Sequence, residues 1–425
     1  PALLSSELPT PDSPPVRVRL LGEDLVAFRD TNGSVGLFVQ SCPHRGASLF
    51  FGRNEEEGLR CVYHGWKFDT AGACVDMPSE PAESNFRAKV HARTYAATER
   101  NGVIWVYMGP RETPPPLPEF EANLVPEAGV TFSKVLRECN WMQALEGDID
   151  TSHLGFLHFG ASKPEDAVEG SFDYYVRKDR APRYDVIDTP VGTSYGAYRP
   201  AEADTMYWRI AHFLFPCFDM IPTGDLGVQV LVRAWVPLDD ENTMFWGINV
   251  TKSMAVGQGG PGSETRTPAA IRVGTSAADR GTLEFLPPSS GWLGKSRISQ
   301  TAANDYGIDR EAQSSGQSFT GIPGIFQQDQ AITESMGKVY DRTHEHLGTS
   351  DAMVIRTRRR LLNAAKALRD EAVTPPAVDE PALYRVRSGG IILPRGTDWL
   401  EATQDLQHPT VEVAAPATGA RASGT

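Results

Sequence analysis

The sequence predicts an α+β protein with two domains, an all-β N-terminal domain followed by a larger domain that mixes helices and strands. Three features lead to this prediction. Short apolar runs separated by turn residues fill residues 16–108, a proline-rich stretch follows at residues 114–118, and segments typical of helices and of strands alternate from about residue 133. A chain of 425 residues also exceeds what one core usually supports, so two separate cores are expected.

The all-β domain is placed at residues 1–115. Its runs are of strand length and rich in Val, Leu, Phe and Tyr, and turn signals such as Asn32-Gly33 and Ala71-Gly72 separate them. The clearest strands are expected at residues 16–21, 25–28, 35–39 and 103–108. Proline restricts the backbone, so the proline-rich stretch predicts a stiff, extended connection and hence a domain boundary.

The larger domain is placed at residues 116–375. A helical segment is expected around residues 140–158, and strand-like runs at residues 228–236 and 244–250 indicate a sheet. Residues 254–321 are rich in Gly, Ser, Ala and Thr, which predicts a long loop or lid in place of regular structure.

The end of the chain divides into three parts. A last helical region is expected from about residue 327 to residue 372, and a C-terminal extension at residues 376–408. Residues 409–425 consist largely of small and polar residues, which predicts a disordered tail. Because residue 1 is Pro and not Met, we also expect that residues upstream are missing from this numbering.

Charge and hydrophobicity exclude some partners. A net charge of -13 would be repelled by nucleic acid and by an anionic membrane surface. No apolar stretch approaches the roughly 18 to 20 residues that span a bilayer, and the first residues lack a charged region ahead of an apolar segment. We therefore expect a cytoplasmic protein that binds neither nucleic acid nor membranes.

The first candidate metal site combines Cys42-x-His44 with Cys61-x-x-His64, sixteen residues apart, inside the all-β domain. Five cysteines are an odd and sparse set for a disulfide framework, so metal ligation explains this cluster better. A 2Fe-2S cluster with two Cys on one iron and two His on the other needs this ligand set. A Cys2His2 zinc site is the alternative, although zinc fingers pair Cys with Cys and place their His pair on a helix.

The residues around these ligands resemble the Rieske domain of ring-hydroxylating oxygenases. The matching segments are Cys42-Pro-His44-Arg-Gly-Ala and Cys61-Val-Tyr-His64-Gly-Trp-Lys-Phe-Asp. The resemblance implies a Rieske 2Fe-2S cluster held by Cys42, His44, Cys61 and His64. The other cysteines, Cys74, Cys139 and Cys217, are expected to be small buried hydrophobic residues.

The second candidate site lies in the helix expected around residues 140–158. At about 100° per residue, Glu146, Asp150 and His153 share one face, whereas His158 lies about 140° from His153. The helix must therefore bend or end near Gly155 if both imidazoles bind one metal in a 2-His-1-carboxylate triad. Two ordinary core histidines are the alternative. The Glu-x3-Asp-x2-His-x4-His pattern resembles the mononuclear iron motif of Rieske oxygenases.

A third ligand must come from further along the chain, where Asp329 and Glu334 lie close together. The resemblance selects Asp329, because the phthalate-dioxygenase-like branch carries its ligand in a Gln-Asp segment ahead of Glu-Ser-Met-Gly. A solvated helix surface is the alternative for Asp329. We expect His344 and His346 to be structural or surface residues.

The resemblance also implies a role for Asp150. In the family, the acidic residue three positions before the first iron-binding His hydrogen-bonds a cluster-ligand His of the neighbouring subunit. Asp150 would then bridge His64 of one chain and His153 of the next, which requires a head-to-tail homo-trimer or a stacked hexamer. The alternative is that Asp150 only orients His153.

Substrate recognition follows from the resemblance, which extends over residues 1–372 and implies a helix-grip (START-like) domain with an antiparallel sheet flanked by helices. It fits the branch of phthalate, chlorobenzoate and phenoxybenzoate dioxygenases, which also contains aryl-ether O-demethylases. An aromatic carboxylate is the expected substrate, and it needs a cation in an apolar pocket. The candidates, each of which has a structural role as its alternative, are Arg177, Arg180, Arg199 and Arg209.

These expectations describe the oxygenase component of a multicomponent Rieske oxygenase. It would activate O2 at a mononuclear Fe(II), with electrons from NAD(P)H delivered by a separate flavin and iron-sulfur reductase, and dihydroxylate the aromatic ring. Two alternatives stay open: a monooxygenase or O-demethylase of methoxylated aromatics, and a Rieske electron carrier that is not an enzyme.

Overall fold

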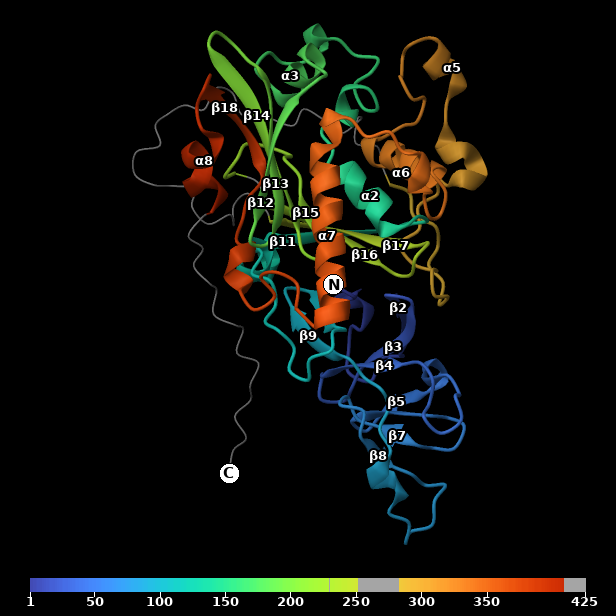
Figure 1. Cartoon of the computed structure of the whole chain (residues 1–425). Coiled ribbons are helices and arrows are strands. Elements are labelled where there is room, and N and C mark those ends of the chain that lie inside the picture. The colour runs from blue at the N-terminus through green and yellow to red at the C-terminus, as the bar shows by residue number, and fades with distance from the viewer. Residues whose placement is uncertain (229, 251–282, 409–425) are drawn as a thin grey trace.

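The computed structural model of the chain describes residues 1–228, 230–250 and 283–408. Figure 1 shows a β-rich N-terminal unit at one end and a large sheet with helices packed on it at the other. The predicted α+β organisation, with an all-β part first, is confirmed.

Three small antiparallel sheets form the N-terminal unit. One contains β2 (Val16–Leu20), β3 (Glu23–Arg29) and β4 (Val35–Val39); the second contains β5 (Arg53–Glu55), β6 (Gly58–Arg60), β7 (Lys67–Phe68) and β8 (Cys74–Asp76). The third contains β1 (Leu3–Leu4), β10 (Val103–Tyr107) and β9 (Ala96–Arg100). The four strands expected from the sequence correspond to β2, β3, β4 and β10.

One antiparallel sheet of eight strands forms the centre of the larger unit. Its order is β11 (Val130–Arg137), β17 (Thr243–Val250), β16 (Val230–Pro237), β15 (Phe218–Met220), β14 (Thr205–Leu214), β13 (Gly192–Pro200) and β12 (Arg183–Thr189), with β18 (Gly389–Pro394) also paired to β14. The two predicted runs correspond to β16 and β17. Because β18 belongs to this sheet, the expected C-terminal extension is an integral part of the larger unit.

Helices cover both faces of the large sheet. On one face lie α2 (Trp141–Asp148), α6 (Ile325–Ser335) and α7 (Ala352–Glu371) (Figure 1). On the other face lies α8 (Trp399–Gln407), whose Trp399 stacks on Trp208 of β14. The shorter helices are α1 (Glu121–Leu124), α3 (Phe172–Lys178) and α5 (Arg310–Ser314). No helix in the described ranges combines the length and apolar character needed to cross a membrane.

Two helix boundaries differ from the predictions. The helix expected over residues 140–158 ends at Asp148, and the helical region expected over residues 327–372 consists of two helices, α6 and α7. Gly337 lies just past α6 with a φ of +93°, a backbone conformation that residues with side chains rarely adopt. A glycine in this conformation ends a helix, which explains why α6 does not continue into α7.

The lid predicted at residues 254–321 is only partly within the described structure. Residues 254–282 lie outside the described residues, as does the predicted tail at residues 409–425. The remaining part contains the 3-10 turn η7 (Ala302–Gly307) and α5, and Phe285 pairs with Ile298. The described part of the segment therefore carries only short elements.

The hydrophobic core does not divide at the domain boundary. One buried cluster joins Leu25 and Trp105 of the N-terminal unit to Val232 and Trp246 of the large sheet. The expectation of two separate cores is therefore wrong at this interface. A second cluster, which includes Phe38 and the two motif cysteines, lies inside the N-terminal unit alone.

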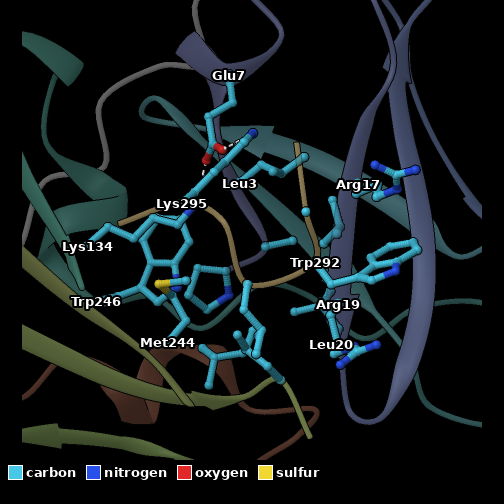
Figure 2. A pocket seen from close by; sticks show the side chains of 17 residues that line it. Leu3, Glu7, Arg17, Arg19, Leu20, Lys134, Met244, Trp246, Trp292 and Lys295 are labelled. Carbon is cyan, nitrogen blue, oxygen red and sulfur yellow. Dashed lines mark hydrogen bonds and ion pairs between the residues drawn. The ribbon is translucent and has the colours of Figure 1, made fainter. Parts of the chain in front are cut away.

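The N-terminal residues explain part of this continuity. β1 pairs with β10, and Glu7 accepts hydrogen bonds from Lys134 of β11 at 2.5 Å and from Lys295 at 2.8 Å. Figure 2 shows the cavity at this junction, between Arg17 of β2 and Trp246 of β17. Its volume is about 40 Å³, which has room for water and for no organic substrate.

Candidate metal centres

The first site is built from two loops that repeat the same backbone geometry. Cys42 follows β4 and Cys61 follows β6. In each loop the Cys N–H donates to a carbonyl five residues on, and the N–H of Gly46 or Gly65 donates back to the Cys carbonyl, at 2.8 to 3.0 Å. Both glycines have a positive φ, which lets the chain turn within four residues. The loops therefore present two equivalent pairs of a thiol and an imidazole.

The two thiols are buried, and the two imidazoles are half-buried. Cys42 and Cys61 are each 3% exposed and lie within hydrogen-bonding distance of each other, and burial raises the pKa of Cys42 to about 11. The rings of His44 and His64 are half-buried, with centroids 4.3 Å apart. His44 also stacks on Trp66, which fixes its plane.

These four residues fit a two-iron cluster better than a single zinc ion. The Nδ1 atom of His44 is buried and has no hydrogen-bond partner among the described residues, so it is free to bind a metal. A tetrahedral zinc site needs all four ligand atoms around one ion. No three of these atoms lie within 4.8 Å of one another, whereas a 2Fe-2S cluster spreads its ligands over two irons.

The second site forms after the end of α2. The chain leaves the helix at Asp148, passes Asp150 and enters the 3-10 turn η5 (His153–Gly155). Asp150 and His153 are therefore not on a helix face with Glu146, contrary to the prediction. Glu146 instead accepts hydrogen bonds from Arg342 and Arg358, which lie beyond α6. The helix ends seven residues before Gly155, and this early end brings His153 and His158 together.

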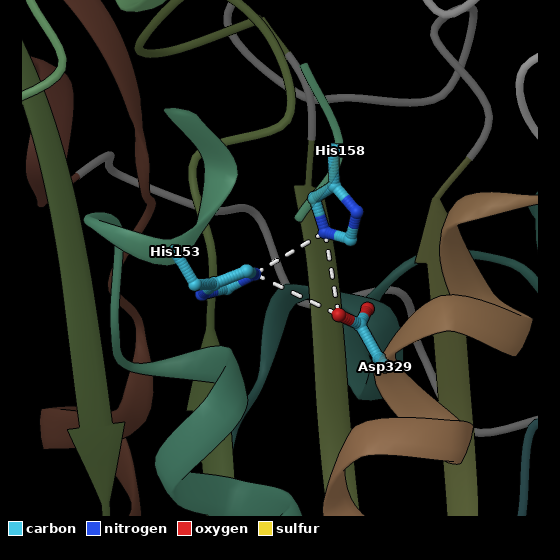
Figure 3. A group of neighbouring side chains, drawn as sticks. All are labelled: His153, His158 and Asp329. Carbon is cyan, nitrogen blue, oxygen red and sulfur yellow. Dashed lines mark hydrogen bonds and ion pairs between the residues drawn. The ribbon is translucent and has the colours of Figure 1, made fainter. Parts of the chain in front are cut away.

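His153, His158 and Asp329 converge on one point (Figure 3). The two Nε2 atoms are 3.2 Å apart, and Oδ1 of Asp329 lies 3.7 Å from His153 Nε2 and 3.3 Å from His158 Nε2. One ion about 2 Å from each atom would contact all three. It is the single group of this kind in the described ranges of the chain.

The charge of the site suits a cation. Burial disfavours the ionised form of Asp329, but the neighbouring His158 and His153 outweigh burial and lower its pKa to about 2. Glu334, the other carboxylate weighed from the sequence, accepts from the N–H of Glu138 and the hydroxyl of Tyr306, both at 2.8 Å. Glu334 is therefore occupied elsewhere, and only Asp329 reaches the two imidazoles.

Each imidazole of the triad has a hydrogen-bond partner at its Nδ1 atom. His153 Nδ1 lies 3.3 Å from Asp150 Oδ2, and His158 Nδ1 lies 2.8 Å from Gln328 Oε1. These partners fix the rings so that both Nε2 atoms point at Asp329. Gln328 belongs to no recognisable motif of its own. The one feature of the sequence that points to its role is its position directly before Asp329.

Asp150 has one side free for a further contact. Its carboxylate accepts from the N–H groups of Ser152 at 2.6 Å and His153 at 3.2 Å, and from the Tyr184 hydroxyl at 3.4 Å. The side chain nevertheless remains 26% exposed. His344 and His346, by contrast, are exposed and lie outside the triad.

Two of the four candidate arginines hold a loop. Arg177 Nε donates to Ser162 Oγ at 2.8 Å, and Arg180 donates to the carbonyls of Ser162 at 3.1 Å and Phe159 at 3.4 Å. Both contact the aromatic rings beside His158, since Arg177 lies over Phe159 and Arg180 over Phe156. Their interactions fix the chain that follows His158.

The other two arginines are buried and only partly paired: Arg199 Nε donates to the Asp179 carbonyl at 2.7 Å, and Arg209 lies over the Phe172 ring. Arg199 is 1% exposed and Arg209 is 5% exposed. Arg199 Nη1 and Nη2, and Arg209 Nε and Nη1, have no hydrogen-bond partner among the described residues. Burial and the charge of Arg209 lower the pKa of Arg199 to about 10.

The sheet register places these arginines together. Arg209 of β14 pairs with Ala197, two residues before Arg199 on β13, so the two side chains are diagonal neighbours on one face. The charges of Arg199, Arg209 and Asp150 all act on Tyr195, another residue of that face. The arginines therefore lie on the sheet face that packs against α2 and α7, and Arg209 also lies over the ring of Phe172 in α3.

Comparisons with known proteins agree with this geometry. A Rieske [2Fe-2S] domain family model matches residues 1–96, and the LigXa C-terminal domain like model matches residues 106–259 and 294–417. The 3-chlorobenzoate-3,4-dioxygenase oxygenase subunit of Comamonas testosteroni is 44% identical, over 94% of this chain and 90% of that protein. This chain belongs to the Rieske non-haem iron oxygenases.

Other Rieske oxygenases are also similar to this chain in sequence or in fold. The phthalate 4,5-dioxygenase oxygenase subunit of Pseudomonas putida is 37% identical, over 94% of this chain and 88% of that protein. The 5,5'-dehydrodivanillate O-demethylase oxygenase subunit of a Sphingobium strain is 29% identical, over 87% of this chain and 75% of that protein. The solved structure of dicamba monooxygenase bound to dicamba shares the fold, with a TM-score of 0.53 at 16% identity over 85% of this chain and 94% of that one.

Membership confirms several predictions from the sequence. The protein is an enzyme of the aromatic ring-hydroxylating type, which excludes the alternative of a non-enzymatic electron carrier. Its cofactors are a Rieske 2Fe-2S cluster and a mononuclear iron, and NAD(P)H supplies electrons through a reductase. Cys74, Cys139 and Cys217 are buried thiols, as predicted.

Proposed function

We propose that this Rieske oxygenase dihydroxylates an aromatic carboxylate of the benzoate, phthalate or phenoxybenzoate type. The observation that carries the proposal is the pair of buried arginines, Arg199 and Arg209, on the sheet face whose Tyr195 is also within reach of the Asp150 charge. The relatives named for 3-chlorobenzoate and phthalate support the same substrate class.

The arginine pair supports an anionic substrate on physical grounds. A buried charge without a partner is unfavourable, because it has lost its hydration. Arg199 and Arg209 together have four buried nitrogen atoms with no hydrogen-bond partner among the described residues. A carboxylate accepts from guanidinium groups in a bidentate manner, which compensates the charge and fixes the direction of the ring. Arg177 and Arg180 are not included, because their donors already serve the loop after His158.

The metal ligands are part of the same proposal. Cys42, His44, Cys61 and His64 would hold the cluster, and His153, His158 and Asp329 the mononuclear iron. When bound, the cluster supplies single electrons and the iron supplies a site for O2 activation. The protein's own contribution is orientation: Asp150 and Gln328 hold the Nδ1 atoms, so that each ring presents Nε2.

We further propose that Asp150 links the two sites between subunits. Asp150 touches His153 on one side and is partly exposed on the other, and His64 is half-buried at the surface of the N-terminal unit. A neighbouring subunit could place its His64 against Asp150, in a head-to-tail trimer or a hexamer. The reductase partner would be a flavin and iron-sulfur protein.

The test is a substrate screen with the iron-loaded protein, a generic flavin and iron-sulfur reductase, and NADH. Phthalates, benzoates, phenoxybenzoates and methoxybenzoates are supplied one at a time, and O2 uptake is compared with product mass. A product with two added oxygens and two added hydrogens on a carboxylated ring is expected. Silence with every carboxylate would overturn the substrate class.

A second candidate is O-demethylation of a methoxylated aromatic carboxylate, which the similarity to the dehydrodivanillate O-demethylase subunit favours. The arginine pair serves this reaction equally well, because it binds the carboxylate and not the reacting group. Release of formaldehyde with a phenol product identifies this reaction in the same screen.

A further inference from the structure

A buried acid lies on the large sheet next to the triad and takes no part in the function described so far. Asp219 of β15 is fully buried, and neither of its carboxylate oxygens accepts a well-formed hydrogen bond from a donor in the described part of the chain. An ionised carboxylate in this state would be strongly destabilising. Asp219 therefore has to be neutral or to find a partner that is itself an acid.

The Asp148 side chain is that partner. Asp148 is the last residue of α2, and its carboxyl group lies within hydrogen-bonding reach of Asp219. Asp148 Oδ1 accepts from Arg233 and Oδ2 accepts from Trp235 Nε1 at 2.7 Å. Asp148 thus has two well-formed donor contacts, whereas Asp219 feels the same Trp235 and Arg233 only as weaker partners. A proton on Asp219 that is donated to Asp148 satisfies both groups.

Electrostatics agree with this arrangement. Burial and then the charge of Asp148 hold the pKa of Asp219 well above its usual range. Burial also raises the pKa of Asp148, despite the opposing effect of Arg233. Repulsion between two neighbouring buried carboxyl groups disfavours the state in which both are ionised and favours a proton shared between them.

The pair lies within the electrostatic reach of the triad. The charge of Asp329 acts on Asp148, and the charge of Asp148 acts on His153. The other charged groups that face the pair are Arg233 on β16 and Arg137 on β11, and the Arg137 residue is 1% exposed. The pair is therefore embedded between the sheet and the helices that carry the iron ligands.

We propose that Asp148 and Asp219 form a proton-sharing carboxyl pair that acts as the internal acid of the oxygen chemistry. The inference rests on the proposed iron ligands, but not on the proposed substrate. Dihydroxylation breaks the O–O bond, forms two C–O bonds and takes up two electrons from NAD(P)H and two protons. Monooxygenation takes up the same electrons and protons and releases water. In both reactions the pair gives up its proton and is protonated again from solvent.

The shared proton is tested without turnover, by infrared spectroscopy of the full chain carrying 13C-labelled aspartate. The wild type is expected to show the C=O stretch of a protonated aspartic acid at neutral pH, and Asp219→Asn is expected to lose it. Asp188→Asn is the control, because Asp188 is paired with Arg356 at the surface and its carboxyl group is ionised. A wild type without the band, or an Asp219→Asn variant that keeps it, overturns the pair.

Stability provides a second test that is independent of iron. A carboxyl pKa raised by folding contributes stability at low pH and loses it as pH rises through the folded pKa. The free energy of unfolding of the wild type should therefore fall toward alkaline pH more steeply than that of Asp219→Asn, whose amide can still donate to Asp148. Equal pH dependence of the two proteins contradicts the proposal.

The role as an acid is tested in the holoenzyme. Asp219→Asn should keep its iron content, its cluster spectrum and its affinity for substrate. Turnover should fall on the order of 100-fold, with more of the consumed O2 released as hydrogen peroxide. Unchanged turnover and coupling would leave the pair purely structural and overturn the inference. A wild type that shows the band but takes up no mononuclear iron contradicts the ligand assignment, and with it this role.

Discussion

Two buried guanidinium groups without anions set a strong condition on what binds beside them. Arg199 and Arg209 lie on adjacent strands, with unpaired donors on the same face. A hydrogen bond to a charged group contributes about 1.5 to 3 kcal/mol, so each arginine offers a substantial part of the binding energy of a small acid. At the scale of single residues, the specificity that we propose is therefore electrostatic.

The first prediction concerns this pair. Arg199→Met and Arg209→Met should each raise the KM for the carboxylate substrate about 10- to 100-fold, because each removes a charge-assisted hydrogen bond from the bound carboxylate. Steady-state O2 uptake measures the effect. Arg356→Met, which removes a surface arginine paired with Asp188, is the control and should leave KM unchanged. An unaltered KM in both substrate-site variants would refute the role of the pair.

The second prediction concerns the third iron ligand. Asp329→Ala should lose the mononuclear iron and all oxygenation, but keep the visible spectrum of the cluster. Glu334→Gln is the matched control, since this neighbouring carboxylate bonds Glu138 and Tyr306 away from the triad. Metal analysis together with absorption spectra provides the measurement. Iron retained by Asp329→Ala and lost by Glu334→Gln would reverse the assignment.

The third prediction concerns the residue behind His158. Gln328→Leu removes the acceptor that holds His158 Nδ1 and should weaken the binding of mononuclear iron about 10- to 100-fold. Competition with an iron chelator measures this affinity. An affinity equal to that of the wild type would mean that packing alone orients His158.

At the scale of helices and strands, the end of α2 decides the geometry of the iron site. The three ligands proposed from the sequence converge in the structure, and the spacing of His153 and His158 indicated that the helix must be interrupted. It does not predict where the interruption falls. Asp148 is held by Arg233 and Trp235 of β16, a contact between residues far apart in the sequence that no local pattern reveals.

Other features that the sequence does not reveal also depend on contacts between residues far apart in the chain. The four candidate arginines look alike in sequence, and only the pairing of β13 with β14 shows which two are buried on the sheet with unpaired donor atoms. Gln328 carries no motif of its own, since its role depends on where α6 packs. Strand periodicity, by contrast, is local, and β2, β3, β4 and β10 were predictable from it.

The fourth prediction tests the C-terminal elements. Trp399 of α8 is buried against Trp208 and donates to Asp185 at 2.8 Å. Trp399→Ala should lower the free energy of unfolding by about 3 to 5 kcal/mol, because it leaves a cavity on the outer face of the sheet. Leu400→Ala, at an exposed position of the same helix, should change it little. Denaturant unfolding compares the two, and equal stability of both variants would show that α8 does not support the sheet.

At the scale of the whole molecule, the continuous core joins the cluster-binding unit firmly to the large sheet. The cluster and the iron of one chain are thus held at a fixed separation. Electrons must either cross that separation within the chain or come from the cluster of a neighbouring chain. Asp150 touches His153 in its own chain and its side chain is 26% exposed, and we propose that it receives the electron from a neighbouring subunit.

The fifth prediction tests this transfer by mixing two inactive variants. His64→Ala removes a cluster ligand, and Asp150→Asn keeps both metals but breaks the bridge, so each variant alone should be nearly inactive. In a mixed assembly, the cluster of the Asp150→Asn chain can serve the iron of a His64→Ala neighbour through its intact Asp150. Differently tagged chains, co-expressed and purified through both tags, should regain turnover. A mixed assembly that stays inactive, or full activity of Asp150→Asn alone, would contradict transfer between subunits.

The most direct test of the central claim compares a carboxylate with its neutral counterpart under 18O2. The iron-loaded enzyme, its reductase and NADH are given benzoate in one reaction and benzamide in the other, and the products are weighed by mass spectrometry. We predict 18O in the product of the carboxylate and little or none in that of the amide. Oxygenation of the amide with no product from the carboxylate would contradict recognition by the buried arginines.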